Sequence, residues 1–128
     1  MMFLPDCVPE IAAYYQVPTE IIAAVQQVES GAQGQDAGKV GPNKNGTYDL
    51  GAMQVNTWWL PKLNQWGIDE QELLENECTN IAVGTWTLHQ NLNQYGDLKA
   101  ALSAYNTGRP DSEIGLEYAN RVLRLMEK

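Results

Sequence analysis

Glu29 is the residue of this 128-residue sequence whose position most clearly suggests chemistry. It closes a predicted helix over residues 18–30. On a helical wheel that turns about 100° per residue, Glu29 falls within the apolar arc of Ile22, Val25 and Val28. A helix C-terminus and an apolar surround both raise the pKa of a carboxyl group, which favours a general acid that is still protonated near neutral pH. The alternative is a boundary glutamate that reaches water.

A second stretch with candidate binding residues is LGAMQVNTWW, residues 50–59. Gly51 lets a ligand approach the backbone closely, and Gln54 and Asn56 each offer a hydrogen-bond donor and an acceptor. Sugars need such a mixture, together with aromatic faces for their C–H surfaces. The aromatic residues that could supply those faces are Tyr48, Trp58, Trp59 and Trp66. The alternative, which we expect for at least two of the tryptophans, is a place in the core.

A third stretch, SAYNTG, places Tyr105 and Asn106 at the end of a predicted helix, just before Gly108. A tyrosine hydroxyl and an asparagine amide at a helix terminus are well exposed for ligand contact. The alternative for Asn106 is a role as a C-cap residue.

These residues must be positioned by helices, because the sequence reads as helices joined by turns. The predicted helices cover residues 6–16, 18–30, 57–66, 69–74, 76–95, 98–106 and 112–127. Residues 31–50 show no periodicity, and a loop of that length in a compact domain is often functional. We expect this loop, with a small hairpin and a type I′ turn at Asn45–Gly46, to form one wall of a cleft. The fold class is therefore mainly α, in one compact helical domain over residues 1–128.

Composition and charge exclude several classes of function. The formal net charge is −8, which argues against nucleic acid and against an anionic membrane surface as partners. No stretch approaches the roughly 20 apolar residues that span a bilayer, so we expect no membrane insertion. The N-terminal MMFLPDC shows no signal peptide, so either the protein stays inside the cell or an export signal has been removed.

The two cysteines, Cys7 and Cys78, could form one bridge or remain two buried thiols. There is no CxxC, and the single His89 cannot build a zinc site with two distant cysteines. We therefore expect no metal and no cofactor, and we expect a monomer.

Four motifs occur in a fixed order along the chain: VES at 28–30, GAMQVN at 51–56, AYNTG at 104–108 and YANRV at 118–122. In this order and spacing the sequence resembles the lysozyme-like lytic transglycosylases of the soluble-lytic-transglycosylase type. Those enzymes carry an ES pair, a GLMQ-type segment, an AYN-type segment and a late tyrosine. The early and late cysteines resemble a small subgroup that accompanies secretion, conjugation and pilus machinery. The resemblance implies a lysozyme-like α+β fold.

The resemblance also implies roles for individual residues. Glu29 matches the catalytic glutamate, and Ser30 matches a serine that supports the helix end. The residues implied in substrate binding or in shaping the cleft are Gly51, Met53, Gln54, Tyr105, Asn106 and Tyr118, of which Tyr118 is expected near the glutamate. Ala52 departs from the family pattern, because a bulky leucine is usual there. The longer stretch before Gly51 leaves contacts from Thr47, Tyr48 or Asp49 open.

The implied reaction cleaves the β-1,4 bond between N-acetylmuramic acid and N-acetylglucosamine in peptidoglycan, giving a 1,6-anhydro product with Glu29 as the single catalytic carboxyl group. The resemblance further implies a Cys7–Cys78 disulfide, an oxidising periplasm and secretion or conjugation proteins as partners. Two alternatives stay open: a lysozyme-type hydrolase that uses Asp49 as a second carboxylate, and an inactive wall-binding module. We expect instead that Asp49 stabilises the loop through an Asx-type turn ahead of Gly51.

Overall fold

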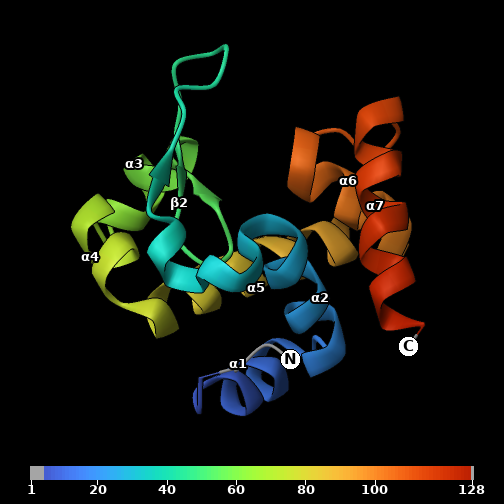
Figure 1. Ribbon diagram of the computed structural model, residues 1–128, viewed down its shortest axis with the longest axis horizontal. Helices are drawn as coiled ribbons and strands as arrows, with labels where there is room; N and C mark the ends of the chain where they lie inside the picture. Colours follow the sequence, from blue (N-terminus) through green and yellow to red (C-terminus); the bar gives the residue numbers. More distant parts are fainter. Residues whose placement is uncertain (1–4, 128) are drawn as a thin grey trace.

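The computed structural model describes residues 5–127, which form a mainly helical fold with one small sheet (Figure 1). The elements, in chain order, are α1 (Val8–Tyr15), α2 (Thr19–Ser30), the 3₁₀ segment η1 (Gly31–Ala37), β1 (Lys39–Val40), β2 (Asp49–Leu50), β3 (Val55–Asn56), the 3₁₀ segment η2 (Thr57–Trp59), α3 (Leu60–Asn64), α4 (Glu70–Glu75), α5 (Glu77–Tyr95), α6 (Leu98–Thr107) and α7 (Glu113–Met126). This confirms the predicted fold class, mainly α with a small hairpin in an α+β arrangement. Residues 1–4 of the MMFLPDC segment lie outside the described residues.

Side-chain caps explain where several helices begin. Each capping oxygen accepts a backbone N–H from the first turn, which satisfies one of the donors that a helix start leaves unpaired. The capping residues are Asn56 for η2, Asp69 for α4, Asn76 for α5, Asp97 for α6 and Ser112 for α7. These starts agree with the prediction, whereas the helix predicted to reach Trp66 ends earlier, with α3 at Asn64.

The segment 31–50 is more ordered than its sequence predicts. Its first part forms η1, and the rest forms an antiparallel hairpin of β1 and β2; β3, which follows the segment, pairs with β2 in the same antiparallel sheet. At the tip, the Gly46 N–H donates to the Asn43 carbonyl at 2.9 Å. The predicted type I′ turn is wrong, because it needs positive φ at both central residues and of the pair only Gly46, not Asn45, has it.

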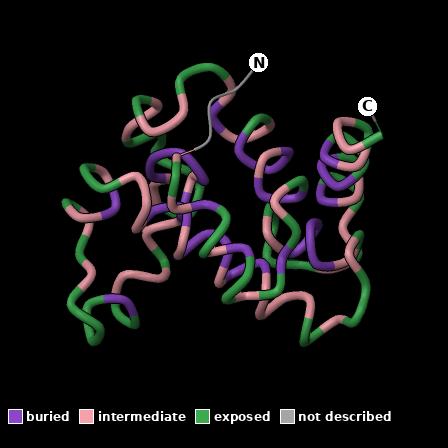
Figure 2. The backbone as a smooth tube through the Cα atoms, turned by 90° about the horizontal axis from the view of Figure 1, so that it is seen from below, coloured by how far each residue is buried: buried purple, intermediate pink, exposed green. Residues whose placement is uncertain are grey.

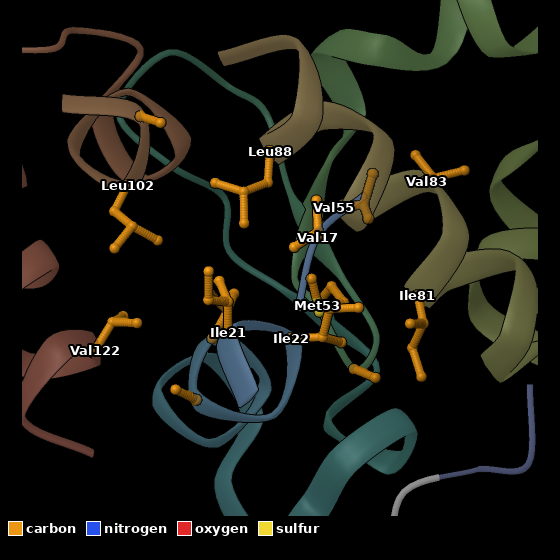
Figure 3. Packing of buried hydrophobic residues seen from close by; sticks show 14 of the residues in the cluster. Val17, Ile21, Ile22, Met53, Val55, Ile81, Val83, Leu88, Leu102 and Val122 are labelled. Carbon is orange, nitrogen blue, oxygen red and sulfur yellow. The ribbon is translucent and has the colours of Figure 1, made fainter. Parts of the chain in front are cut away.

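The core lies where α2 meets the other elements (Figure 3). Ile22 and Val25 of α2 are fully buried, and Leu102 of α6 and Val122 of α7 are buried against the same cluster. The tube view shows buried stretches on the inward sides of the helices and exposed ones at the loop ends (Figure 2). The central position of α2 fixes the direction in which Glu29, at its C-terminal end, can point.

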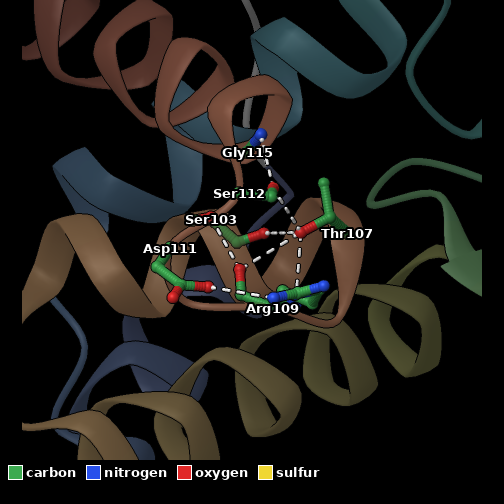
Figure 4. Close-up of polar contacts among 6 residues, drawn as sticks. All are labelled: Ser103, Thr107, Arg109, Asp111, Ser112 and Gly115. Atoms are coloured by element: carbon green, nitrogen blue, oxygen red, sulfur yellow. Dashed lines mark hydrogen bonds and ion pairs between the residues drawn. The ribbon is translucent and has the colours of Figure 1, made fainter.

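A polar network joins α6 to α7 (Figure 4). The Ser103 hydroxyl donates to the Arg109 carbonyl at 2.7 Å, and the Ser112 hydroxyl donates to the Thr107 hydroxyl at 3.1 Å. Gly115 lies so close to the Ser103 hydroxyl that a side chain there would collide with it. The network therefore sets the start of α7, the helix that carries Tyr118.

A disulfide joins Cys7 to Cys78, which confirms the bridge that the resemblance implied. It ties the residue before α1 to the first turn of α5 across 71 positions of sequence. No helix within residues 5–127 has the length and apolar character that a membrane crossing requires.

Candidate active site

A cleft of about 1010 Å³ lies between the hairpin and the helices. The hairpin tip and β2 line one side, as predicted, and α5 and α6 line much of the rest. The predicted residues that line the cleft are Glu29, Gln54, Asn56, Trp58, Trp59, Tyr105 and Asn106. The cleft thus brings together predicted residues from three separate parts of the sequence: the end of α2, the stretch 54–59 and the end of α6.

Glu29 is partly buried at the end of α2 and opens onto this cleft. Burial is the main cause that raises the pKa of Glu29, to about 7, and the negative charge of Asp49 raises it further. A hydrogen bond from Tyr118 and the positive charge of Arg121 act in the opposite direction. The predicted direction of the pKa shift is therefore confirmed. Near neutral pH the group exists in both its protonated and its ionised form.

Tyr118 contacts the glutamate directly. Its hydroxyl donates a hydrogen bond to Glu29 Oε2 at 2.6 Å, and its side chain is almost fully buried. Burial and the nearby Glu29 raise the pKa of Tyr118 far above its usual value, so the hydroxyl stays a donor. Tyr118 thus lies next to the glutamate, as expected, but it does not itself line the cleft, so the structure does not place it where it would bind substrate directly.

Asp49 also lines the cleft. Its carboxylate accepts hydrogen bonds from the side-chain amides of Asn56 at 3.0 Å and Asn43 at 3.2 Å. The expected Asx-type turn ahead of Gly51 is wrong, because these contacts use neighbouring side chains of the hairpin. Asn56 has a double function here, since its oxygen also caps η2 by accepting the Trp58 N–H.

The Gly51–Gln54 turn presents only one of its side chains to the cleft. Gly51 and Met53 are buried, and neither lines the cleft. Gln54 is partly exposed, lines the cleft and donates through Nε2 to the Gly51 carbonyl at 2.9 Å. Met53 packs in the core against Gly84, where any side chain would collide with it.

Tyr105 and Asn106 differ in their exposure. Asn106 is exposed on the cleft, as predicted. The expectation that the Tyr105 hydroxyl is free for a ligand is wrong, because it donates to the Met53 carbonyl at 2.7 Å. Burial raises the pKa of Tyr105 well above its usual value, so this hydroxyl remains a donor.

The tryptophans are more exposed than expected. Trp58, with 67% of its surface exposed, and the partly buried Trp59 both line the cleft, and their rings meet edge to face at 4.9 Å. Trp66 is 53% exposed and packs on Trp86 outside the cleft lining. The expectation that at least two of Trp58, Trp59 and Trp66 belong to the core is wrong.

Sequence reasoning missed the face of α5 that lines the cleft. This face consists of Thr87, Asn91, Gln94 and Tyr95. Their spacing of four, three and one residues puts them on one side of a helix, a polar stripe that could have been noticed. Asn43, Lys44 and Asn45 at the hairpin tip also line the cleft; the sequence predicted this segment as a cleft wall but did not single out these residues.

Within residues 5–127 no group of three or more histidine, cysteine, aspartate or glutamate side chains is arranged to hold a metal ion. The side chains that line the cleft carry carboxyl groups, amides, hydroxyls, aromatic rings and the amine of Lys44.

The sequence matches the profile described as "Transglycosylase SLT domain" over residues 6–121. Among similar proteins, "Invasion protein IagB" of Salmonella typhimurium is 32% identical over 119 residues, which cover 91% of this chain and 72% of the relative. "Peptidoglycan-binding-like protein" of Escherichia coli O157:H7 is 32% identical, over 91% of this chain and 73% of the relative. "Protein IpgF" of Shigella flexneri is 28% identical, over 93% and 78%.

The chain belongs to the transglycosylase SLT domain family. This membership indicates a function of the lytic-transglycosylase type.

Proposed function

We propose that this protein is a peptidoglycan lytic transglycosylase, with residues 1–128 as one catalytic domain. The main support for the proposal is the position of Glu29: its carboxyl group lines a cleft of about 1010 Å³, and its pKa is raised to about 7. Such a group can donate a proton and later accept one at the same pH. The peptidoglycan-binding-like relative supports the choice of substrate.

In the first step, protonated Glu29 gives its proton to the glycosidic oxygen between N-acetylmuramic acid and N-acetylglucosamine. The bond from C1 to that oxygen breaks, the N-acetylglucosamine end leaves as an alcohol, and positive charge develops at C1. Tyr118 holds the carboxyl group by its hydrogen bond, which becomes stronger as Glu29 turns into a carboxylate.

In the second step, the ionised Glu29 takes the proton from the C6 hydroxyl of the same muramic acid residue. The C6 oxygen bonds to C1 and closes the 1,6-anhydro ring, and Glu29 returns to its protonated form. No water is consumed. Gln54 and Asn106 supply amide groups to the bound glycan, and Trp58 offers an exposed ring face to a sugar.

A second candidate function, lysozyme-type hydrolysis, is favoured by the position of Asp49. This carboxylate lines the same cleft and raises the pKa of Glu29 by its charge. Two carboxyl groups on one cleft are the usual arrangement for glycoside hydrolysis. The hydrogen bonds from Asn43 and Asn56 instead support an Asp49 carboxylate that is held in place and acts on Glu29 only through its charge. In that case Glu29 alone transfers protons.

Analysis of the released glycan ends distinguishes these functions. Purified wall sacculi are digested with the wild type and with Asp49→Asn, and the products are measured by mass spectrometry. We expect 1,6-anhydro ends from both proteins, with a lower rate for the variant. Reducing ends from the wild type, lost in Asp49→Asn, would establish the hydrolase. Bound glycan with no released product would indicate an inactive wall-binding module.

We further propose that the enzyme works in the periplasm and opens the wall locally for an envelope-spanning secretion, conjugation or pilus system. The disulfide fits an oxidising compartment. The relative named as an invasion protein supports a link to such machinery. Affinity capture with secretion components tests this role, and the absence of any bound component would contradict it.

A further inference from the structure

The backbone of the Gly51–Gln54 turn is held by contacts from outside the turn. Gln54 has φ of 50°, in the left-handed region, where a residue other than glycine is strained. Such strain persists only where the surroundings determine the conformation strongly. The contacts that supply this constraint therefore decide whether Gln54 reaches the cleft.

Asn80 of α5 provides one set of contacts. It is fully buried, and its Nδ2 donates to the carbonyls of Leu50 at 2.8 Å and Leu73 at 3.0 Å. Its Oδ1 accepts the N–H of Met53 at 2.9 Å. One side-chain amide thus binds Leu50, just before the turn, and Met53, within the turn, and it links both to Leu73 of α4.

The side-chain amide of Gln35, in η1, provides a second set of hydrogen bonds. Its Nε2 donates to the carbonyls of Leu73 at 2.7 Å and Leu74 at 2.8 Å, and its Oε1 accepts the N–H of Ala52 at 2.9 Å. The two amides approach Gly51 so closely that a side chain there would collide with both of them. The glycine is therefore required by the amide pair as well as by its own φ of 70°.

We propose that Gln35 and Asn80 are positioning residues that hold Gln54 toward the glycan. Neither of them lines the cleft, so each acts through the turn. They bind consecutive N–H groups of the turn, Ala52 and Met53, and meet at the Leu73 carbonyl. This inference rests on the proposed function, because it assumes that Gln54 contacts glycan.

The test uses Gln35→Met, which keeps the length of the side chain and removes its three hydrogen bonds. Gln35 lies partly exposed in η1, so the fold should survive the change. The control is Gln33→Met, an exposed glutamine of the same segment. Affinity for a soluble N-acetylglucosamine tetramer is measured through the change in tryptophan fluorescence, because Trp58 and Trp59 line the cleft.

We expect Gln35→Met to weaken tetramer binding about tenfold, because small misplacements of a contact group cost affinity, and Gln33→Met to leave it unchanged. The double variant Gln35→Met, Gln54→Asn distinguishes a positioning role of Gln35 from a general loss of structure caused by Gln35→Met. Asn tolerates a left-handed conformation and is shorter by one methylene. In that background, Gln35→Met should cost less than about twofold, because the two changes act on one contact.

Three results of the binding measurement would overturn the proposal: unchanged binding by Gln35→Met, unchanged binding by Gln54→Asn, or fully additive losses in the double variant. Hydrogen exchange of the Ala52 amide adds a measurement that does not depend on glycan. Its rate should rise in Gln35→Met, and an unchanged rate also contradicts the inference. If the wild type binds no tetramer, the proposed function itself fails, which is a separate outcome.

Discussion

Glu29 and Tyr118 form the pair of residues on which the proposed chemistry depends. They are 89 positions apart in the sequence, and their 2.6 Å hydrogen bond joins the end of α2 to α7. Burial raises the pKa of Glu29, and the tyrosine hydroxyl lowers it again by stabilising the carboxylate. The balance between the two effects sets the pH range in which a protonated Glu29 is available.

Removal of the Tyr118 hydroxyl should move this range upward. In Tyr118→Phe the carboxylate loses a donor, so the pKa of Glu29 rises above its value of about 7. The first step needs the protonated form, and the alkaline limb of the kcat profile should therefore shift up by about one pH unit. The measurement is glycan cleavage as a function of pH.

The matched control for this change is Tyr14→Phe, because Tyr14 is 80% exposed on α1. Its pH profile should coincide with that of the wild type. A downward shift of the alkaline limb in Tyr118→Phe, or no shift, would contradict the assigned role of the hydroxyl.

Single residues could be predicted from the sequence where the information is local. The place of Glu29 follows from the periodicity of one helix. The positions of Gln35 and Asn80 could not be predicted, because their partners lie in other elements and become neighbours only after folding. The same reason explains the Tyr105 hydroxyl, which binds a carbonyl 52 positions away.

At the scale of elements, helix starts were predictable and loop geometry was not. Capping residues such as Asp97 act within one turn, so the sequence shows them directly. Residues 31–50 contain many glycines and no periodicity, which suggested a loop. The predicted small hairpin is present, but η1 was not predicted, because side-chain contacts such as those of Gln35 to α4 come from outside the segment.

The hairpin and α5 together explain the size of the cleft. The hairpin tip lines one side, and the polar stripe of α5 from Thr87 to Tyr95 lines another. Neither element carries the family motifs that identify Glu29 or Gln54. The motifs therefore predicted that Glu29 and Gln54 share one site, whereas the extent of the cleft around them depends on tertiary structure.

At the scale of the whole molecule, the Cys7–Cys78 disulfide links the start of the fold to its longest helix. Closing a loop with a separation of 71 residues removes much of the entropy of the unfolded chain. The double variant Cys7→Ser, Cys78→Ser should therefore lose about 4 kcal/mol of unfolding free energy. Urea unfolding with and without a reductant measures this loss.

Reductant should destabilise the wild type and leave the double variant unaffected, which is the internal control. Equal unfolding midpoints for the oxidised wild type and the double variant would contradict a stabilising bridge.

Cleavage of purified wall sacculi by Glu29→Gln, compared with Glu20→Gln, tests the central claim most directly. Both glutamates lie on α2, but Glu20 is exposed in the first turn, whereas Glu29 lines the cleft. We predict that Glu29→Gln loses activity by about 10²–10⁴-fold and stays folded, whereas Glu20→Gln keeps the wild-type rate. A folded Glu29→Gln protein that cleaves the wall at the wild-type rate would contradict Glu29 as the catalytic acid.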